Sequence, residues 1–313
     1  MTLGERLAGG DRSAAPAALN VIEDRSPAGR ERTRELLAAV SPAKLGGEAP
    51  AHLVGVTGPP GAGKSSLLSA LVKHWRADGR TVAVLAVDPS SKRSGGSLLG
   101  DRARIEHDPR DDGVLIRSTA AGGRLGGLAA PTREAAQALA PAYDVVVVET
   151  VGVGQSETDV EELCDTTAVV VQPASGDTLQ FLKAGIMEVP DVLVVTKADL
   201  GDVALRARRD LASALRALGS RSTPVVSVSS VPPPSGIEEL AAALDEHRAA
   251  LDVAAARRSA RRLAALADFT AERGEAGVRA LGGRRAAERF LEDQDPALDV
   301  PALMAALERA AGP

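Results

Sequence analysis

The stretch Gly58-Pro59-Pro60-Gly61-Ala62-Gly63-Lys64-Ser65 fits the phosphate-binding pattern GxxxxGK[ST]. It lies between a short apolar run, Leu53 to Thr57, and a helical pattern from Ser66 to Trp75. This chemistry needs glycines that let backbone N–H groups wrap a phosphate, a lysine that reaches the β- and γ-phosphates, and a hydroxyl that holds Mg²⁺. The stretch and its context predict a nucleotide-binding protein. The alternative is a surface turn that matches by chance, because the chain contains 31 Gly and 19 Pro.

The composition argues against a nucleic-acid partner. The 313 residues carry a formal net charge of −5, whereas a general nucleic-acid binder normally has an excess of Lys and Arg. Aromatic residues make up only 2% of the chain, so its core must be built from Ala, Val and Leu. One local cluster of arginines is predicted to be the solvated face of a helix: Arg257, Arg258, Arg261 and Arg262.

Cysteine usage and hydropathy favour a cytoplasmic protein. The single cysteine, Cys164, excludes an internal disulfide and a CxxC metal site, which favours a reducing compartment. The first residues lack the basic-then-apolar layout of a signal peptide, and no apolar stretch approaches the roughly 18 residues of a membrane span. We therefore expect neither a leader nor a membrane partner.

Seven short apolar runs, rich in β-branched residues, alternate with helical stretches. They predict an α/β fold with a mostly parallel sheet of about seven strands, covered by helices on both faces. The runs are 53–57, 81–87, 114–117, 145–149, 168–172, 192–196 and 225–229.

We expect three parts along the chain: an N-terminal helical region (1–50), a P-loop nucleotide-binding domain (51–248) and a C-terminal helical extension (249–313). The helices of such an extension cannot bury both of their faces against a domain that is already complete. It is therefore expected to support a homodimer interface, and a mobile tail is the alternative.

Acidic residues stand at the carboxyl ends of two predicted strands. Glu149 ends one buried run, at the place where a P-loop fold holds a carboxylate near Mg²⁺ or the attacking water, and Gly152 can offer its N–H to the γ-phosphate. Asp88 ends another run, and Asp101 follows in the loop beyond, so both are candidate metal ligands. The alternatives are a solvent-facing Glu149 and a helix-capping Asp101.

The sequence Thr196-Lys197-Ala198-Asp199 approximates the guanine-recognition sequence NKxD. The carboxylate of that motif accepts hydrogen bonds from guanine N1 and N2, which adenine does not offer, and the lysine stem lies against the base plane. Thr196 replaces the usual Asn, an amide that braces the neighbouring loops, so a weaker guanine selectivity is expected. Ser229 ends the seventh run, where GTPases commonly place a loop that contacts the base.

Taken together, these motifs resemble the MeaB/ArgK GTPases, which are chaperones of adenosylcobalamin-dependent acyl-CoA mutases such as methylmalonyl-CoA mutase. The resemblance covers residues 17 to about 250 and rests on five segments: GPPGAGKSS (58–66), VDPSS (87–91), GGSLLGDR (95–102), ETVGVGQSE (149–157) and GDTLQFLKAGIMEVPD (176–191). It implies a homodimeric, Mg²⁺-dependent GTPase that uses GTP and GDP to gate loading of the mutase cofactor and to protect the mutase. No direct cobalamin site is evident in the chain.

The resemblance also assigns roles to residues. Nucleotide binding falls to Gly58, Gly61, Ala62, Gly63, Lys64, Ser65, Ser66, Lys197, Asp199 and Ser229. Lys64, Asp88, Glu149 and Gly152 are the implied catalytic residues, and Ser65, Asp88, Asp101 and Glu149 the implied metal ligands. Asp177, Gln180 and Lys183 match a switch that relays the nucleotide state to the mutase. The chain departs from the family at Thr196 and at Ala103, where Thr is usual.

Three other functions remain open from the sequence. A nickel-insertion GTPase would need clustered metal ligands, but His52, His74, His107, His247 and Cys164 form no close group in the sequence. An ATP-dependent kinase is disfavoured by the Thr-Lys-Ala-Asp sequence, and a nucleotide-controlled scaffold differs only in whether hydrolysis matters. No residue stands out as the one that positions water, since Gln155 lies three residues beyond Gly152, so slow intrinsic turnover is expected. The sequence does not identify the client mutase.

Overall fold

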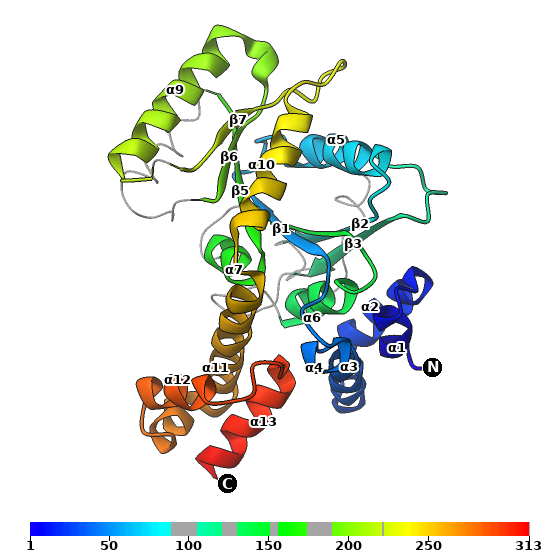
Figure 1. Cartoon of the computed structure of the whole chain (residues 1–313), viewed down its shortest axis with the longest axis vertical. Helices are drawn as coiled ribbons and strands as arrows, with labels where there is room; N and C mark the ends of the chain where they lie inside the picture. The colour runs from blue at the N-terminus through cyan, green and yellow to red at the C-terminus, as the bar shows by residue number, and fades with distance from the viewer. Residues whose placement is uncertain (89–104, 121–129, 151–155, 174–189, 221, 313) are drawn as a thin grey trace. The chain divides into compact units, whose positions relative to one another are not determined.

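The structure is a computed structural model that describes residues 1–312 except 89–104, 121–129, 151–155, 174–189 and 221. The chain divides into two compact units (Figure 1). One unit comprises Met1–Pro50 together with Asp252–Pro313, and the other comprises Ala51–Leu251. In the described part of the chain, no helix has both the length and the apolar character needed to cross a membrane.

The unit Ala51–Leu251 is built on a parallel sheet of seven strands in the order β3-β2-β4-β1-β5-β6-β7. All six pairings between neighbours are parallel, which confirms the predicted fold class. The strands are β1 (His52–Thr57), β2 (Val82–Asp88), β3 (Val114–Ala120), β4 (Val145–Thr150), β5 (Thr166–Val171), β6 (Val192–Val195) and β7 (Val225–Ser227).

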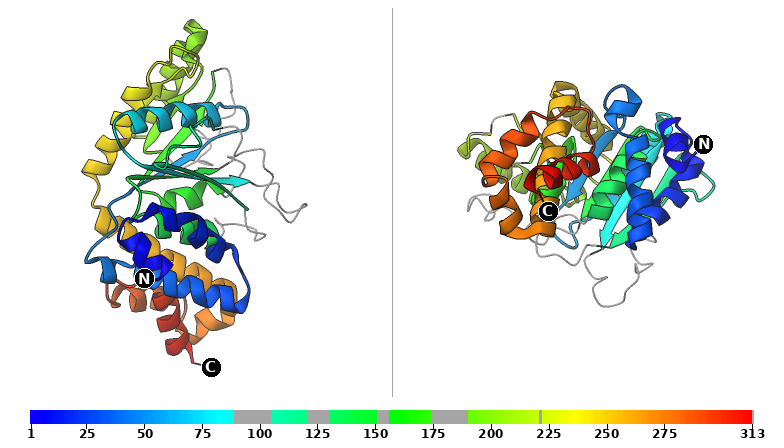
Figure 2. Two further views of the ribbon diagram at one scale, coloured as in Figure 1. Left: turned by 90° about the vertical axis from the view of Figure 1, so that its right-hand side faces the viewer. Right: turned by 90° about the horizontal axis from the view of Figure 1, so that it is seen from below.

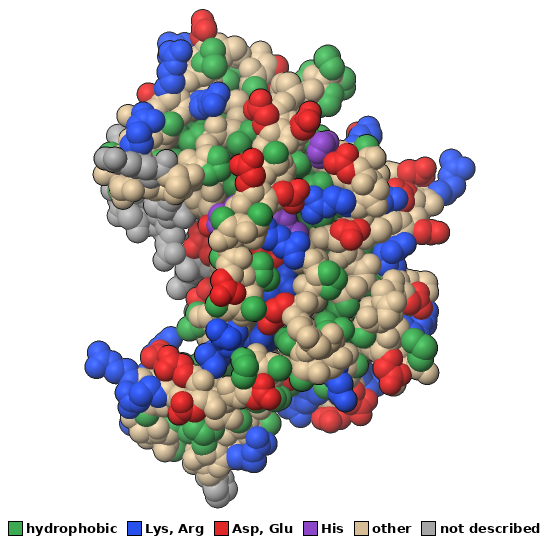
Figure 3. Space-filling model, viewed as in Figure 1, with side chains coloured by type: hydrophobic (Ala, Val, Ile, Leu, Met, Phe, Trp, Pro, Cys, Tyr) green, Lys and Arg blue, Asp and Glu red, His purple; other side chains and the backbone are tan. Residues whose placement is uncertain are grey.

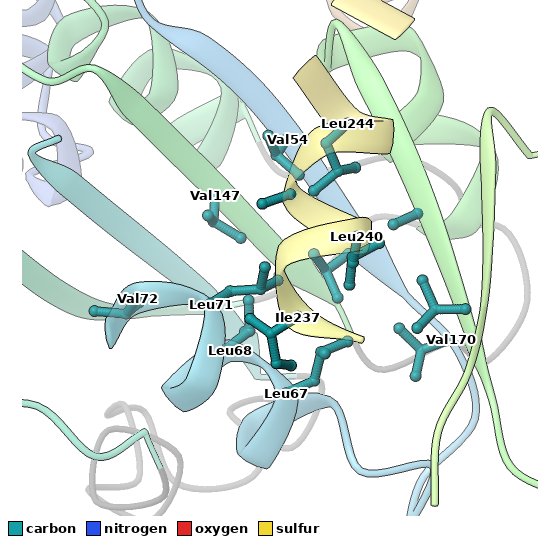
Figure 4. Close-up of a cluster of buried hydrophobic side chains, with 14 of the residues drawn as sticks. Val54, Leu67, Leu68, Leu71, Val72, Val147, Val170, Ile237, Leu240 and Leu244 are labelled. Atoms are coloured by element: carbon teal, nitrogen blue, oxygen red, sulfur yellow. The ribbon is translucent and has the colours of Figure 1, made fainter. Parts of the chain in front are cut away.

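Helices cover both faces of the sheet, as the continuous apolar runs predict for parallel strands. Residues Val170 of β5 and Val194 of β6 face a core formed with α5 (Lys64–Ala77) and α10 (Ile237–Ala250), part of which is drawn in Figure 4. Their sequence neighbours point the other way, toward α9 (Asp202–Ala217). The left view of Figure 2 shows α5 on one side of the sheet and α6 (Ala130–Leu139) on the other. A further helix, α7 (Ser156–Leu163), precedes β5.

The strand order places the predicted nucleotide site. Strand β1 lies between β4 and β5, which both follow it in the sequence, so the strand order changes direction at β1. Ligands of open parallel sheets bind outside the carboxyl ends of the strands, near such a change of strand order. The phosphate loop follows β1, Glu149 lies near the end of β4, and Thr196 directly follows β6, so all three lie at this edge.

The other unit is helical. Its N-terminal part contains α1 (Leu3–Ala8), η1 (Arg12–Ala14), α2 (Ala15–Glu23), α3 (Pro27–Ala39) and α4 (Pro42–Leu45). Its C-terminal part contains α11 (Val253–Ala280), α12 (Arg284–Glu292) and α13 (Val300–Ala311), which share an apolar core centred on Phe269 and Leu307. Gly274 interrupts α11 with a φ of 63°, a conformation that L-residues other than Gly seldom adopt.

The expectation of a solvated arginine face was wrong for two of its four residues. Arg257 and Arg261 are buried, and their i, i+4 spacing places them on the same side of α11. Arg257 donates to the carbonyl oxygen of Ala49 at 2.7 Å, and Arg261 makes a two-pronged ion pair with Glu48 at 2.9 and 2.8 Å. These two side chains therefore fasten the segment before β1 to the C-terminal helices of the same unit.

A chain of polar contacts joins α10 to the amino ends of β1 and β5. The fully buried His52 lies 2.9 Å through Nε2 from the hydroxyl of Thr166 and 3.4 Å through Nδ1 from Asp245. The same hydroxyl lies 2.9 Å from Nδ1 of His247, whose Nε2 lies 3.1 Å from Asp191. Figure 3 shows histidine side chains among acidic and basic ones on the face of the molecule drawn there. The contacts hold β1, the strand that leads into the phosphate loop, from its amino end.

We predict that His52 lowers the stability of the folded protein at mildly acidic pH. Its pKa is lowered, chiefly because burial disfavours the imidazolium, while the contact with Asp245 acts in the opposite direction. Below the unfolded value of about 6.5, the unfolded chain binds more protons at this residue than the folded chain does. The free energy of unfolding should therefore fall as the pH drops below about 6.5, by at most about 1.4 kcal/mol per pH unit from this residue.

Urea unfolding at pH 7.5 and 5.5 tests this prediction on three proteins. The wild type and the control His74→Gln, a substitution on α5, should both lose more stability between the two pH values than His52→Gln does. The pKa of Asp245 is itself lowered, chiefly by its hydrogen bond with His52, so this carboxyl titrates below the tested window. An equal loss in all three proteins would show that His52 is not the group responsible.

Candidate nucleotide site

The phosphate loop connects β1 to α5 through a tight turn that only glycine permits. Gly58 has a φ of 143°, and a Cβ at this position would collide with the carbonyl oxygen of Val170 in β5. Gly63, directly before α5, has a φ of 90°. The glycines of the motif thus have a local reason that is independent of any ligand, namely the close approach of the loop to β5 and the left-handed turn into the helix.

Lys64 is buried although it carries a charge. Only 6% of the residue is exposed, and its Nζ donates to the carbonyl oxygens of Gly58 and Pro59 at 2.7 and 3.2 Å. The carboxylate of Glu149 lies 4.0 Å from the same nitrogen. The side chain therefore lies back over the loop, with the ammonium held by oxygen atoms, as a buried cation requires.

The start of α5 carries groups that suit an anion. Ser65 and Ser66 follow Lys64 in the first turn, where Ser65 is half-buried and Ser66 exposed. The first N–H groups of a helix have no partner within the helix, and the helix dipole favours negative charge at this end. The loop N–H groups, Lys64 and this helix end together form a site that suits a phosphate chain.

Glu149 is buried at the carboxyl end of β4, so the solvent-facing alternative does not hold. Beside it, the hydroxyl of Thr150 donates to that of Thr57 at 3.1 Å, which ties the end of β4 to the end of β1. Asp88 is the last residue of β2, next to β4, and its side chain is not described. The other residues singled out from the sequence lie outside the described residues: Asp101, Ala103, Gly152, Gln155, Asp177, Gln180 and Lys183.

Lys197 and Asp199, the predicted base-binding residues, follow β6 and are both exposed. Asp199 accepts a hydrogen bond of 2.7 Å from the hydroxyl of Ser229, which lies just after β7. Lys197 has a φ of 55° and donates through Nζ to Oε1 of Gln172 at 2.5 Å. The carboxylate and the lysine stem are therefore each held by a polar residue from a neighbouring strand end.

Thr196 connects the base-binding residues to the phosphate loop. Its hydroxyl is buried and lies 2.6 Å from the carbonyl oxygen of Ala62, within the loop, and 3.0 Å from that of Val171, at the end of β5. The single hydroxyl proton is shared between these two acceptors. A hydroxyl at this position can thus brace the two loops, the role expected of the Asn that it replaces.

Sequence reasoning missed Gln172 as a site residue. A signal was present, because Gln172 directly follows a buried apolar strand at the same sheet edge as Glu149. Its contact with Lys197 depends on the pairing of β5 with β6, which the sequence does not reveal. The rule that selected Glu149, a polar residue at the carboxyl end of a buried strand, would also have selected Gln172.

Comparison with known proteins gives a consistent result. A family described as "Methylmalonyl Co-A mutase-associated GTPase MeaB" matches residues 15–280. A protein of Pyrococcus abyssi is 43% identical over 255 residues, which cover 79% of this chain and 76% of that protein.

Two further relatives carry informative names. The "Methylmalonic aciduria type A homolog, mitochondrial" of Caenorhabditis elegans is 41% identical over 224 residues, which cover 69% of this chain but only 56% of that protein. The crystal structure of a "LAO/AO transport system kinase" is similar over 93% of this chain and 95% of its own, with a TM-score of 0.66 and 29% identity.

We predict that the hydroxyl of Thr196 contributes to nucleotide affinity. Thr196→Val keeps the shape of the side chain but removes the donor to Ala62, so the Kd for GDP should rise about 5- to 10-fold, as expected for one lost hydrogen bond in a partly buried site. Thr196→Ser keeps the donor and should stay within about twofold of the wild type. Calorimetric titration with GDP measures both variants, and a wild-type Kd for Thr196→Val would contradict the bracing role.

Proposed function

This chain belongs to the MeaB family of methylmalonyl-CoA mutase-associated GTPases, and from that premise we propose that it is a GTP-driven switch for an adenosylcobalamin-dependent acyl-CoA mutase. The chain is a P-loop GTPase, which hydrolyses GTP to GDP and phosphate. The finer proposal is that this reaction gates the loading of cofactor into the mutase and protects the mutase.

The arrangement around Lys64 is the observation that carries the proposal. The buried ammonium, the carboxylate of Glu149 at 4.0 Å and the start of α5 lie at one sheet edge, suited to the phosphates. The hydroxyl of Thr196 joins this place to the base-binding residues through Ala62. Phosphate binding and base binding are thus joined through a short series of direct contacts, as expected of a site for one nucleotide.

In the proposed reaction, water attacks the γ-phosphate in line with the bond that breaks, and the chain supplies electrostatic stabilisation. Lys64 exchanges loop carbonyl oxygens for phosphate oxygens, and the N–H groups of the loop and of the first turn of α5 bind the remaining oxygens. Glu149 lies where a carboxylate can orient water. Slow turnover without a partner is part of the proposal.

Mg²⁺ is part of the proposal, and the residues present fit this ion. The hydroxyl of Ser65 and the carboxylate of Glu149 are oxygen donors, the kind that Mg²⁺ prefers, and Asp88 and Asp101 are further candidates. When bound, the ion would neutralise charge on the β- and γ-phosphate oxygens.

The partner and the assembly are also proposals. The family description names a methylmalonyl-CoA mutase, and the choice among acyl-CoA mutases remains open. Helices α11–α13, which pack around Phe269, are the proposed homodimer interface. A cytoplasmic location is proposed from the single free cysteine.

The alternative functions are less well supported. The family that matches is one of GTPases, whereas the name "kinase" comes from a structure that is 29% identical. A nickel-insertion role would need clustered ligands, and among the described residues no group of three or more His, Cys, Asp or Glu is placed to hold a metal ion.

We predict that the client mutase accelerates GTP hydrolysis. Purified protein alone should turn over GTP slowly, and addition of the correct mutase should raise kcat more than about tenfold, because groups supplied by a partner are worth up to about 10³–10⁵ in related reactions. Phosphate release is measured with each adenosylcobalamin-dependent mutase of the same genome, and with ATP in place of GTP. Stimulation below about twofold by every mutase would contradict the proposed switch.

Glu149→Gln serves as the control for hydrolysis. This variant should retain binding of GDP but lose about 10²-fold or more in turnover, because it removes the carboxylate that is proposed to orient water. Mutase loading that is unaffected by Glu149→Gln would indicate a nucleotide-controlled scaffold, in which binding matters and hydrolysis does not.

A further inference from the structure

The chain after β6 is held from both sides by polar side chains. On one side Ser229, just after β7, donates to Asp199 at 2.7 Å. On the other side Gln172, just after β5, accepts from Lys197 at 2.5 Å. Strand β6 lies between β5 and β7 in the sheet, so the two contacts flank the base-binding residues symmetrically. The first contact involves a residue already assigned to the base, whereas Gln172 has no assigned role.

The backbone at Lys197 is fixed in an uncommon conformation. Among the described residues, Lys197 is the only one other than glycine with a positive φ, 55°. Its neighbours are tied to the flanking strands: Thr196 N donates to Val171 O at 2.9 Å, and Ala198 N donates to Val228 O at 3.0 Å. Strained backbone of this kind persists where the surroundings determine it, often at functional positions. The direction in which the lysine leaves the backbone is therefore set by the sheet.

Gln172 fixes the position of the Lys197 ammonium, at the far end of that side chain. A lysine side chain has four rotatable bonds and loses rotamer entropy when it is held in one arrangement. With the backbone fixed at one end and Nζ held by Oε1 at the other, the four-carbon stem has little freedom left. Because Gln172 is half-buried at the end of β5, its own position is anchored by the sheet.

We propose that Gln172 is a positioning residue that holds the stem of Lys197 against the face of the nucleobase. The inference rests on the proposed GTP function. It assigns the face of the nucleobase and its edge to two different pairs of residues. The pair Gln172 and Lys197 contacts the flat face, which all purines share. The pair Ser229 and Asp199 reads the edge, where guanine differs from other purines.

This division of roles gives a distinctive expectation. Removing the acceptor at position 172 should weaken the binding of GDP and of IDP by the same factor. Guanine and hypoxanthine present the same face and differ only by the 2-amino group. Changes at Asp199 should instead alter the ratio of the two affinities. A merely structural role of Gln172 would disturb the fold or the turnover rate and would not produce this pattern.

Calorimetric titration of GDP and IDP tests the proposal with four single variants and one double variant. Gln172→Met keeps the length of the side chain but removes the acceptor, and should raise both Kd values about 3- to 10-fold with an unchanged ratio. Gln172→Glu keeps an acceptor and should stay within about twofold of the wild type. Gln137→Met, the same substitution on α6, should change neither Kd. In the Lys197→Ala background, Gln172→Met should have no further effect on either Kd.

Turnover and folding separate the proposal from its alternatives. In GTP hydrolysis, the effect of Gln172→Met should fall on KM more than on kcat, and its thermal unfolding midpoint should match that of Gln172→Glu. The proposal is overturned if Gln172→Met leaves both Kd values unchanged, alters their ratio, or retains its full effect in the Lys197→Ala background. Failure of the wild type to bind GDP would instead contradict the proposed GTP function itself.

Discussion

The burial of the Lys64 ammonium is the constraint on which the rest of the site depends. A cation with so little exposure is stable only where oxygen atoms surround it. Those oxygens come from Gly58 and Pro59 in the loop and, at 4.0 Å, from Glu149 in β4. The path of the loop in turn needs glycine at position 58, because a side chain there would strike β5. Three central strands therefore cooperate to hold one charge, and the same arrangement suits it to exchange loop oxygens for phosphate oxygens.

The predicted base-binding residues are connected to the phosphate loop through Thr196. Its hydroxyl reaches a loop carbonyl and the end of β5, so the ends of β1, β5 and β6 form one connected group. Lys197 and Asp199 extend from this group, and each is held by a polar side chain from an adjacent strand end. A hydrogen bond from Thr196 to Ala62 thus connects the two parts of the proposed site.

The sequence predicted the features that local physics determines. Short β-branched runs identified all seven strands because strands buried on both faces need continuous apolar residues, and the glycines with Lys64 identified the loop because phosphate binding has a fixed local pattern. Features that depend on contacts between residues far apart in the sequence were not predicted. Arg257 and Arg261 resemble surface residues until Glu48 and Ala49 are placed beside them, and Gln172 acquires a partner only when β5 pairs with β6. Asp101 and Gly152 lie outside the described residues, so their predicted roles stay predictions.

The most direct test of the account is a competition between GDP and ADP for the wild-type protein, measured by displacement of a fluorescent guanine nucleotide. A site that recognises the guanine edge through Asp199 should bind GDP at least about 100-fold more tightly than ADP, because adenine leaves the carboxylate without its donors. Equal affinity for the two nucleotides would contradict the account. It would show that the residues after β6 do not read the base, and that the chain uses its phosphate site for a different nucleotide.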